Sequence, residues 1–195
     1  NSTVFTRATY LNLTKNGLNM IGDHAFECFP NLETLVLNNN QWLVGAVDTD
    51  NVKCNATALS DLPKLKHLHL KNAFADKAFV YDDQYLAVKD HMRAVDYFPN
   101  PDKVLAGNNL LNLETIDFDD NRILGFSPDI FCNLTLLKTL RLSSNALGNP
   151  LIYGNDHGNP DVHAYHGDCA LSLETLDLSG NLIAYLSANF TGELG

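Results

Sequence analysis

Apolar and polar residues follow the same short pattern at six places along the chain. Each segment reads apolar-x-x-apolar-x-apolar-x-x, and five of the six then end with asparagine. The segments are 8–16, 32–40, 65–73, 113–121, 137–145 and 173–181. The apolar-x-apolar step has the period of a β-strand whose alternate side chains turn inward. The pattern therefore predicts six short strands.

The six segments match the leucine-rich-repeat signature, and their number makes the match strong. One such unit cannot bury its apolar face alone, whereas stacked units cover one another and build a continuous core. The sequence therefore predicts an α/β repeat fold, a curved leucine-rich-repeat solenoid. We expect a parallel β-sheet on its concave face and an irregular or short-helical convex side, where residues such as Phe26 and Phe126 fill the core.

We expect one array of about six repeats across residues 1–195, with three insertions. The repeats are 8–31, 32–64, 65–112, 113–136, 137–172 and 173–195. The first strand leucine or isoleucine recurs at steps of 24, 33, 48, 24 and 36 residues, so repeats two, three and five carry extra residues. Helical spacing of apolar residues in repeat three predicts a helix over roughly 82–97. The turn-rich insertion at 149–163 is expected to be an irregular loop.

Asparagine ends five of the six segments, where the chain leaves the strand. These residues are Asn16, Asn40, Asn121, Asn145 and Asn181. An inward-turned amide offers both a donor and an acceptor to backbone groups that the bend would leave unpaired. We expect an asparagine ladder that serves each residue's own repeat and the next one. In the third repeat Asn72 stands one place early, before Ala73, which predicts a distorted turn ahead of the insertion.

Composition narrows the class of partner. The chain is 45% hydrophobic with a formal net charge of -10, and it contains no apolar run long enough to span a bilayer. Binding to nucleic acid rests on Lys and Arg that neutralise phosphates, so nucleic acid is disfavoured as a ligand. The start, Asn1-Ser2-Thr3-Val4, lacks the features of a signal peptide, which we expect to be absent or already removed.

Five Asn-x-Ser/Thr sequons and an even number of cysteines favour the secretory pathway. The sequons lie at Asn1, Asn12, Asn55, Asn133 and Asn189. We therefore expect N-linked glycans, no other cofactor and an extracellular or lumenal location, with the cell surface favoured over the endosome. Asn12 lies between Leu11 and Leu13, so its glycan would stand on the concave face of the first repeat and obstruct a partner there.

The four cysteines allow three pairings. A rod-like stack keeps repeats one and two far from repeats four and five, which leaves Cys28–Cys54 and Cys132–Cys169. Each bridge would fasten an insertion to the flank of the solenoid. The competing interpretation, a zinc site, lacks the C-x-x-C or paired-histidine spacing that zinc ligands use, so no metal site is expected.

We expect binding to use the insertions and one lateral edge of the solenoid. Polar side chains that face out of the predicted strands form a mixed-charge strip, which is a secondary candidate binding surface. Its candidate residues are His67, His69, Asp117, Asp119, Arg141 and Asp177. For any single residue the alternative is an ordinary solvated sheet face. No G-x-S-x-G, H-E-x-x-H or phosphate loop occurs, so we expect no catalysis. The His- and Asp-rich segment 156–168 could bind a metal, sense pH or be a solvated loop.

The whole chain resembles the leucine-rich-repeat ectodomain of a Toll or Toll-like receptor. The 24-residue steps, the asparagine column, the phenylalanines Phe26, Phe126 and Phe190, and the cysteine-anchored insertions carry this resemblance. It implies a horseshoe ectodomain, a single membrane span and an intracellular signalling domain. It also implies activation when a protein or microbial ligand pairs two ectodomains.

A secreted or matrix leucine-rich-repeat adhesion protein is the alternative function. Such a protein would lack a signalling domain and carry terminal caps close by. No cysteine cluster marks a cap at either end of this chain, so we expect an internal fragment of a longer array. The departure puts any transfer of a family ligand in doubt, because no ligand-reading motif is shared.

Overall fold

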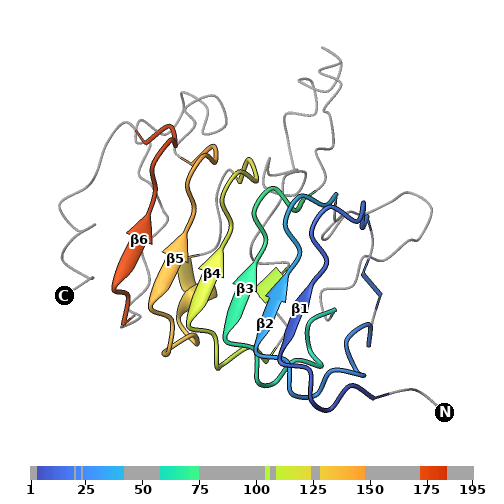
Figure 1. Ribbon diagram of the computed structural model, residues 1–195. Coiled ribbons are helices and arrows are strands. Elements are labelled where there is room, and N and C mark those ends of the chain that lie inside the picture. The colour runs from blue at the N-terminus through green and yellow to red at the C-terminus, as the bar shows by residue number, and fades with distance from the viewer. Residues whose placement is uncertain are drawn as a thin grey trace, which may run out of the picture.

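The computed structural model describes residues 4–19, 21–22, 24–41, 58–74, 104–105, 109–123, 128–147 and 172–183. Within these ranges six strands of three residues each form one parallel sheet in chain order (Figure 1). The strands are β1 (Tyr10–Asn12), β2 (Thr34–Val36), β3 (His67–His69), β4 (Thr115–Asp117), β5 (Thr139–Arg141) and β6 (Thr175–Asp177). The expected parallel sheet of six short strands is confirmed.

The central residues of the strands lie opposite one another across the whole sheet. The registered column is Leu11, Leu35, Leu68, Ile116, Leu140 and Leu176. The four inner members are fully buried, whereas Leu11 and Leu176 are partly buried. A described neighbour covers each inner strand on both sides, and β1 and β6 on one side only. Stacking of successive repeats therefore creates the core, as the repeat pattern predicts.

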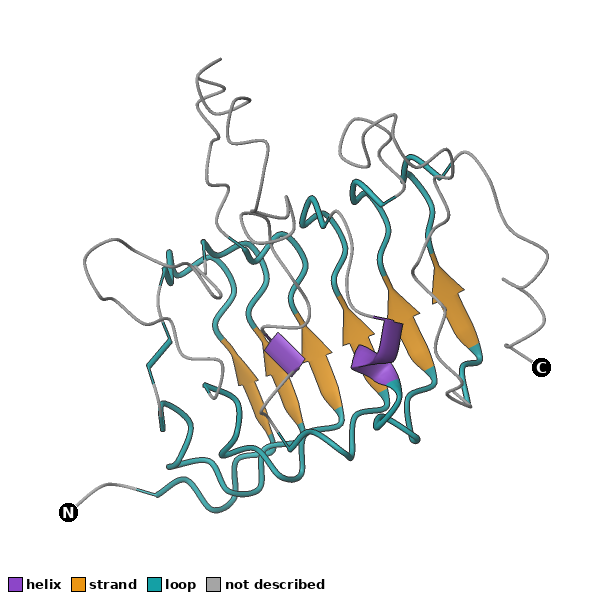
Figure 2. Ribbon diagram, turned by 180° about the vertical axis from the view of Figure 1, so that it is seen from behind, coloured by secondary structure: helices purple, strands orange, loops and turns teal. Residues whose placement is uncertain are grey.

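The core lies behind the sheet and is closed by the second half of each repeat. In repeat four this half contains the 3-10 helix η3 (Pro128–Phe131), which lies on the far side of the sheet from the viewer of Figure 1 and in front in Figure 2. Phe131 and Leu134 pack there, and Ile21 and Phe26 do the same in repeat one. Phe126, Phe190 and the segments 82–97, 149–163 and 156–168 lie outside the described residues.

The turn that follows each strand uses one left-handed residue directly before the ladder position. The residues and their φ angles are Lys15 (58°), Asn39 (55°), Asn72 (46°), Asp120 (59°), Ser144 (54°) and Gly180 (68°). Glycine adopts this conformation without strain, and asparagine and aspartate tolerate it better than other residues. All six repeats therefore bend by the same means, at some cost where Lys15 or Ser144 occupies the place.

The asparagine amides link each repeat to the one before it. Asn145 Oδ1 accepts the N–H groups of Asn121 and Ile123 at 3.0 and 2.9 Å. Its Nδ2 donates to Phe118 O and Leu142 O at 3.0 and 2.9 Å. Asn40, Asn121 and Asn181 are bonded in the same way.

We expected each ladder asparagine to bond backbone groups of the next repeat, and this was wrong. Each one instead bonds backbone groups of the repeat before it. Backbone N–H groups of each turn point toward the following repeat, as when Lys15 N donates to Asn38 O at 3.0 Å. Their acceptor must therefore come from the following repeat, whose asparagine reaches back. Asn16, in the first described repeat, is exposed and gives its own N–H to Asn40.

The third repeat lacks the ladder amide but keeps the turn, so the expected distortion is wrong. Asn72 holds the usual left-handed place, and its N–H donates to Asp119 O at 2.9 Å. Ala73 fills the ladder position and is fully buried. The Asn72 side chain instead donates to Asn39 Oδ1 at 3.1 Å at the surface. The insertion therefore follows a regular turn.

Candidate binding face of the sheet

Two side chains of every strand point away from the core, and together they form what we call the open face. Its first row is Tyr10, Thr34, His67, Thr115, Thr139 and Thr175, and its second row is Asn12, Val36, His69, Asp117, Arg141 and Asp177. The open face is uncharged over β1 and β2. Every charged or titratable group of the second row lies over β3 to β6.

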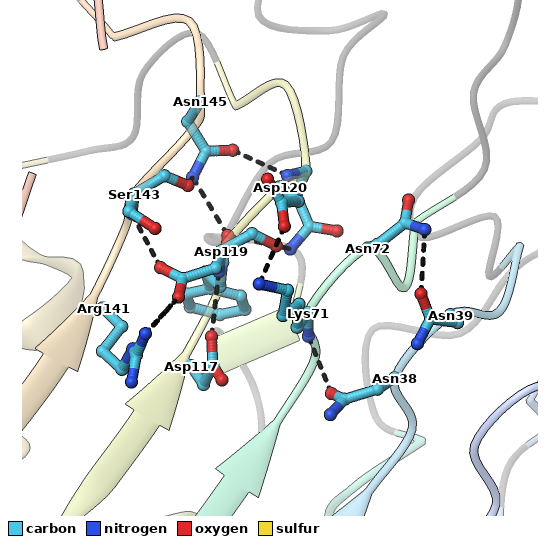
Figure 3. Close-up of polar contacts among 12 residues, drawn as sticks. Asn38, Asn39, Lys71, Asn72, Asp117, Asp119, Asp120, Arg141, Ser143 and Asn145 are labelled. Atoms are coloured by element: carbon cyan, nitrogen blue, oxygen red, sulfur yellow. Dashed lines mark hydrogen bonds and ion pairs between the residues drawn. The ribbon is translucent and has the colours of Figure 1, made fainter. Parts of the chain in front are cut away.

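A buried carboxylate anchors the most prominent cation of the open face. Asp119 is 0% exposed, yet its Oδ2 accepts Arg141 Nε at 3.0 Å and contacts Nη2 at 2.9 Å (Figure 3). Its Oδ1 accepts the N–H of Ser143 at 2.7 Å. A buried charge is tolerated when it is paired and hydrogen-bonded in this way. The guanidinium is thereby fixed while the Arg141 side chain stays 47% exposed.

Asp117 is a second, mostly buried carboxylate beside this pair. Burial is the largest influence and raises its pKa, but the nearby His69, the hydrogen bond from the N–H of Asp119 and the charge of Arg141 together outweigh it. The net effect is a lowered pKa. The Asp119 N–H lies 3.0 Å from Oδ1 and His69 Nδ1 lies 3.8 Å from Oδ2. Asp117 is therefore an anion at neutral pH.

Asp177 completes the acidic surroundings of Arg141. Its Oδ1 accepts Ser179 Oγ at 2.7 Å and Ser179 N at 3.0 Å, and these bonds lower the pKa of its carboxyl group. The charge of Asp119 and its hydrogen bond raise the pKa of Arg141, and Asp117 and Asp177 add to the effect. One guanidinium thus stands among three carboxylates, and the cluster is net acidic.

A further ion pair continues this polar surface past the strand ends. Lys71 Nζ contacts Asp120 Oδ2 at 2.9 Å, and this bond raises the pKa of Lys71. The backbone N–H of Lys71 donates to Asn38 Oδ1 at 2.9 Å (Figure 3). Both charged side chains are exposed. The turns therefore extend the charged part of the open face toward the carboxyl ends of β3 and β4.

The sequence model described as Leucine Rich Repeat matches residues 112–134 and 172–194, which contain β4 and β6. Together with the six-stranded parallel sheet, this decides the fold. The chain folds as a leucine-rich-repeat solenoid. No curated protein matches the sequence.

Solved leucine-rich-repeat structures resemble the chain at low sequence identity. A leucine-rich-repeat protein of Leptospira interrogans is 18% identical, with a TM-score of 0.45, over 93% of this chain and 40% of that one. The ectodomain of the Arabidopsis thaliana membrane receptor kinase GASSHO1/SCHENGEN3, solved with CASPARIAN STRIP INTEGRITY FACTOR 2, is 20% identical with a TM-score of 0.43. That match covers 88% of this chain and 18% of the ectodomain. The chain spans less than half the length of either protein.

The solenoid brings five of the six candidate binding residues onto the open face: His67, His69, Asp117, Arg141 and Asp177. Asp119 was also expected to face outward, and this was wrong. It stands two positions beyond Asp117, where the chain already bends. Its carboxylate is covered by Arg141 and bonded to the next repeat. Asp119 therefore positions residues of the candidate binding surface rather than forming part of it.

A column of alternating charges, formed by the residue directly before each of the strands β2 to β6, was not identified from the sequence. The column is Glu33, Lys66, Glu114, Lys138 and Glu174. Lys66 Nζ lies 3.1 Å from Glu33 Oε2, and Lys138 Nζ lies 3.9 Å from Glu114 Oε2. The sequence does contain this pattern: from the second repeat onward, the second residue of each segment alternates between Glu and Lys. Opposite charges on adjacent repeats favour this register.

The described sequon asparagines, Asn12 and Asn133, are both exposed, whereas Asn1, Asn55 and Asn189 lie outside the described residues. Cys132 forms a disulfide and Cys28 is a free thiol. The expected pairing Cys28–Cys54 is not formed in this structure, because the thiol of Cys28 is free. Cys169 lies outside the described ranges, so the pairing Cys132–Cys169 stays a prediction.

The described part of the solenoid offers no group of three metal-ligating side chains. No helix in that part has the length and apolar character needed to cross a membrane.

Proposed function

We propose that the chain is part of the extracellular ligand-binding domain of a Toll-like receptor, and that a protein ligand docks on the open face over β3 to β6. The observation that carries this proposal is the guanidinium of Arg141, held by the fully buried Asp119 while half of its side chain remains exposed. Arginine is enriched among the residues that dominate binding energy at protein interfaces.

The rigidity of this surface supports binding. Asp177 is fixed by Ser179, and Asp117 is fixed by the N–H of Asp119 and lies beside His69. The strands that carry these side chains are held by cross-strand hydrogen bonds along the whole sheet. A preorganised surface loses less side-chain entropy on association, so more of its contact energy appears as affinity.

The charge of the cluster defines the partner's chemistry. Three carboxylates surround one guanidinium, so the surface attracts a protein patch that carries basic groups and one acceptor for Arg141. Nucleic acid is disfavoured, since the chain carries a formal net charge of -10. A protein ligand with a basic patch is therefore the class of partner that we propose.

The test compares two charge reversals in one repeat. Asp177→Lys alters the open face, whereas Glu174→Lys makes the same charge change at an exposed residue of the strand-start column. The ectodomain, secreted from animal cells, is screened against extracellular proteins and microbial surface components. We expect a partner whose Kd rises about tenfold with Asp177→Lys and hardly at all with Glu174→Lys. Equal losses in both variants would place the contact elsewhere.

The full-length transcript tests the receptor assignment. A membrane span and an intracellular signalling domain downstream of these repeats are expected. A chain with terminal caps and neither of those features would instead be a secreted or matrix adhesion protein. Ligand-induced pairing predicts that sedimentation of the ectodomain shifts from monomer to dimer when the selected ligand is added.

A further inference from the structure

The uncharged half of the open face carries a modification site. We propose that Asn12 bears an N-linked glycan whose first sugar packs against the ring of Tyr10. This inference rests on the secreted location included in the proposed function. It adds a specific residue, a chemical group and a limit on where the protein ligand can bind.

Asn12 is accessible to modification in the folded chain. It is the last residue of β1, begins the sequon Asn12-Leu13-Thr14 and is exposed on the open face. Its Oδ1 accepts the N–H of Thr14 at 2.9 Å, which holds the amide plane against the backbone. Its Nδ2, the atom that would carry the sugar, points to Tyr10 and donates to the tyrosine hydroxyl at 3.2 Å. A glycan on Nδ2 therefore projects beside Tyr10 without displacing the strand.

The chemistry needs one co-reactant, a lipid diphosphate-linked oligosaccharide of the secretory pathway. The Asn12 Nδ2 forms a bond to the anomeric carbon of the first N-acetylglucosamine while the bond from that carbon to the diphosphate oxygen breaks. The amide loses one proton and the lipid diphosphate leaves. The modified Nδ2 keeps one hydrogen, so its hydrogen bond to the Tyr10 hydroxyl can persist.

Tyr10 supplies the packing surface. At 59% its exposure exceeds that of every other exposed large hydrophobic residue that the structure describes. Tyr10 and Asn12 flank the inward-facing Leu11, so both side chains stand on the same side of β1. The C–H bonds of a pyranose form an apolar face, and covering the ring with it removes apolar area of both groups from water. The sugar thus accounts for an aromatic ring that the polypeptide leaves exposed.

The glycan divides the open face into two functional halves. Asn12 registers with Val36 of β2, so a sugar on Asn12 stands over the uncharged strands β1 and β2. The fixed charges of Asp117, Arg141 and Asp177 lie on β4 to β6. The protein ligand is therefore confined to the charged half, and the glycan defines its boundary.

The experiment uses the secreted chain and an internal control. Asn133, in the sequon Asn133-Leu134-Thr135, is exposed and comes two residues after η3, which lies on the opposite side of the sheet from the open face. Enzymatic removal of N-glycans in heavy-oxygen water converts glycosylated Asn to mass-labelled Asp, which peptide mapping assigns to Asn12 or Asn133. We expect label at both positions, and loss of the Asn12 label alone in Thr14→Ala. Label at Asn133 without label at Asn12 overturns this site and leaves the secreted location intact. Absence of label from both overturns the two together.

A double-mutant cycle on Tm tests the contact between the sugar and Tyr10. In the glycosylated parent, Asn12→Gln and Thr14→Ala should each lower Tm by about 2 °C, the size of shift that a modest packing contribution gives in a domain of this length. In the Tyr10→Ala background, which keeps the sequon, the same substitutions should have little effect, and the difference measures the coupling. Equal shifts in both backgrounds would show that the sugar does not pack on Tyr10.

Discussion

Arg141 extends from β5 back over Asp119, a carboxylate that is 0% exposed in the turn after β4, and the two are joined through Nε at 3.0 Å and Nη2 at 2.9 Å. The same carboxylate accepts the N–H of Ser143, so one buried side chain fastens both the backbone and the arginine of the next repeat. Stability and the shape of the candidate binding surface are therefore coupled at this position.

Neutralising Asp119 should cost much more stability than neutralising its neighbour. Asp119→Asn removes a buried charge that holds Arg141, and we expect a loss of about 2 kcal/mol in the free energy of unfolding, measured by urea denaturation. Asp120→Asn is the matched control, because its exposed carboxylate pairs with Lys71 at the surface. Exposed pairs contribute less than about 1 kcal/mol. Similar losses in both variants would contradict the structural role of Asp119.

Removing a ladder asparagine should cost more stability where a described repeat precedes it than at the first repeat. Asn145→Ala leaves the N–H groups of Asn121 and Ile123 without their acceptor, and we expect a loss of about 3 kcal/mol. Asn16→Ala changes an exposed side chain with no described repeat before it, so its cost should stay below about 1 kcal/mol. Urea denaturation of the two variants measures the contrast. An equal cost at both positions would refute the backward-reaching ladder.

Acid should destabilise the chain partly through Asp117. Despite burial, its pKa in the folded state lies below the usual value, because the nearby His69, the N–H of Asp119 and the charge of Arg141 together outweigh burial. A lowered folded pKa means that the contribution to stability is present above about pH 4 and is lost as pH falls through the folded pKa. Asp117→Asn should therefore lower stability at neutral pH and reduce the further loss on acidification. Urea denaturation at neutral and acid pH tests this, and an unchanged acid loss would contradict it.

The alternating column at the strand starts should show coupling between repeats. Lys66→Glu places three glutamates in adjacent repeats, from Glu33 to Glu114, and should cost about 1 kcal/mol at low salt. Adding Glu33→Lys should restore part of that loss, and added salt should shrink the effect. A double-mutant cycle on the free energy of unfolding gives the coupling. A cycle with no coupling at low salt would show that the charges do not interact.

Much of the fold could be predicted because every repeat carries the same pattern of apolar positions. The apolar-x-apolar step identified Leu35, Leu68 and Ile116 as inward-facing strand residues, and the structure places them at the strand centres. Stacking alone then dictates a parallel sheet in chain order. Residues on either side of these centres had to face outward. This is why His69, Arg141 and Asp177 were placed correctly on the open face.

Features that depend on the bend after each strand could not be predicted in the same way. The two-residue alternation ends there, so the pattern could not reveal that Asp119 turns under Arg141. The direction of the ladder depends on where the turn N–H groups point, which a single repeat does not specify. The Glu–Lys column could have been found by comparing equivalent positions of successive repeats, rather than positions within one repeat.

Site-specific photocrosslinking tests the central claim, that the open face over β3 to β6 is the binding surface. A photoreactive side chain is placed at Asp177 in one variant and in another at Asn133, which closely follows the helix η3 behind the sheet. With the partner recovered from the binding screen, the variant at Asp177 should form a covalent adduct and the variant at Asn133 should form none. An adduct from Asn133 with none from Asp177 would contradict the account.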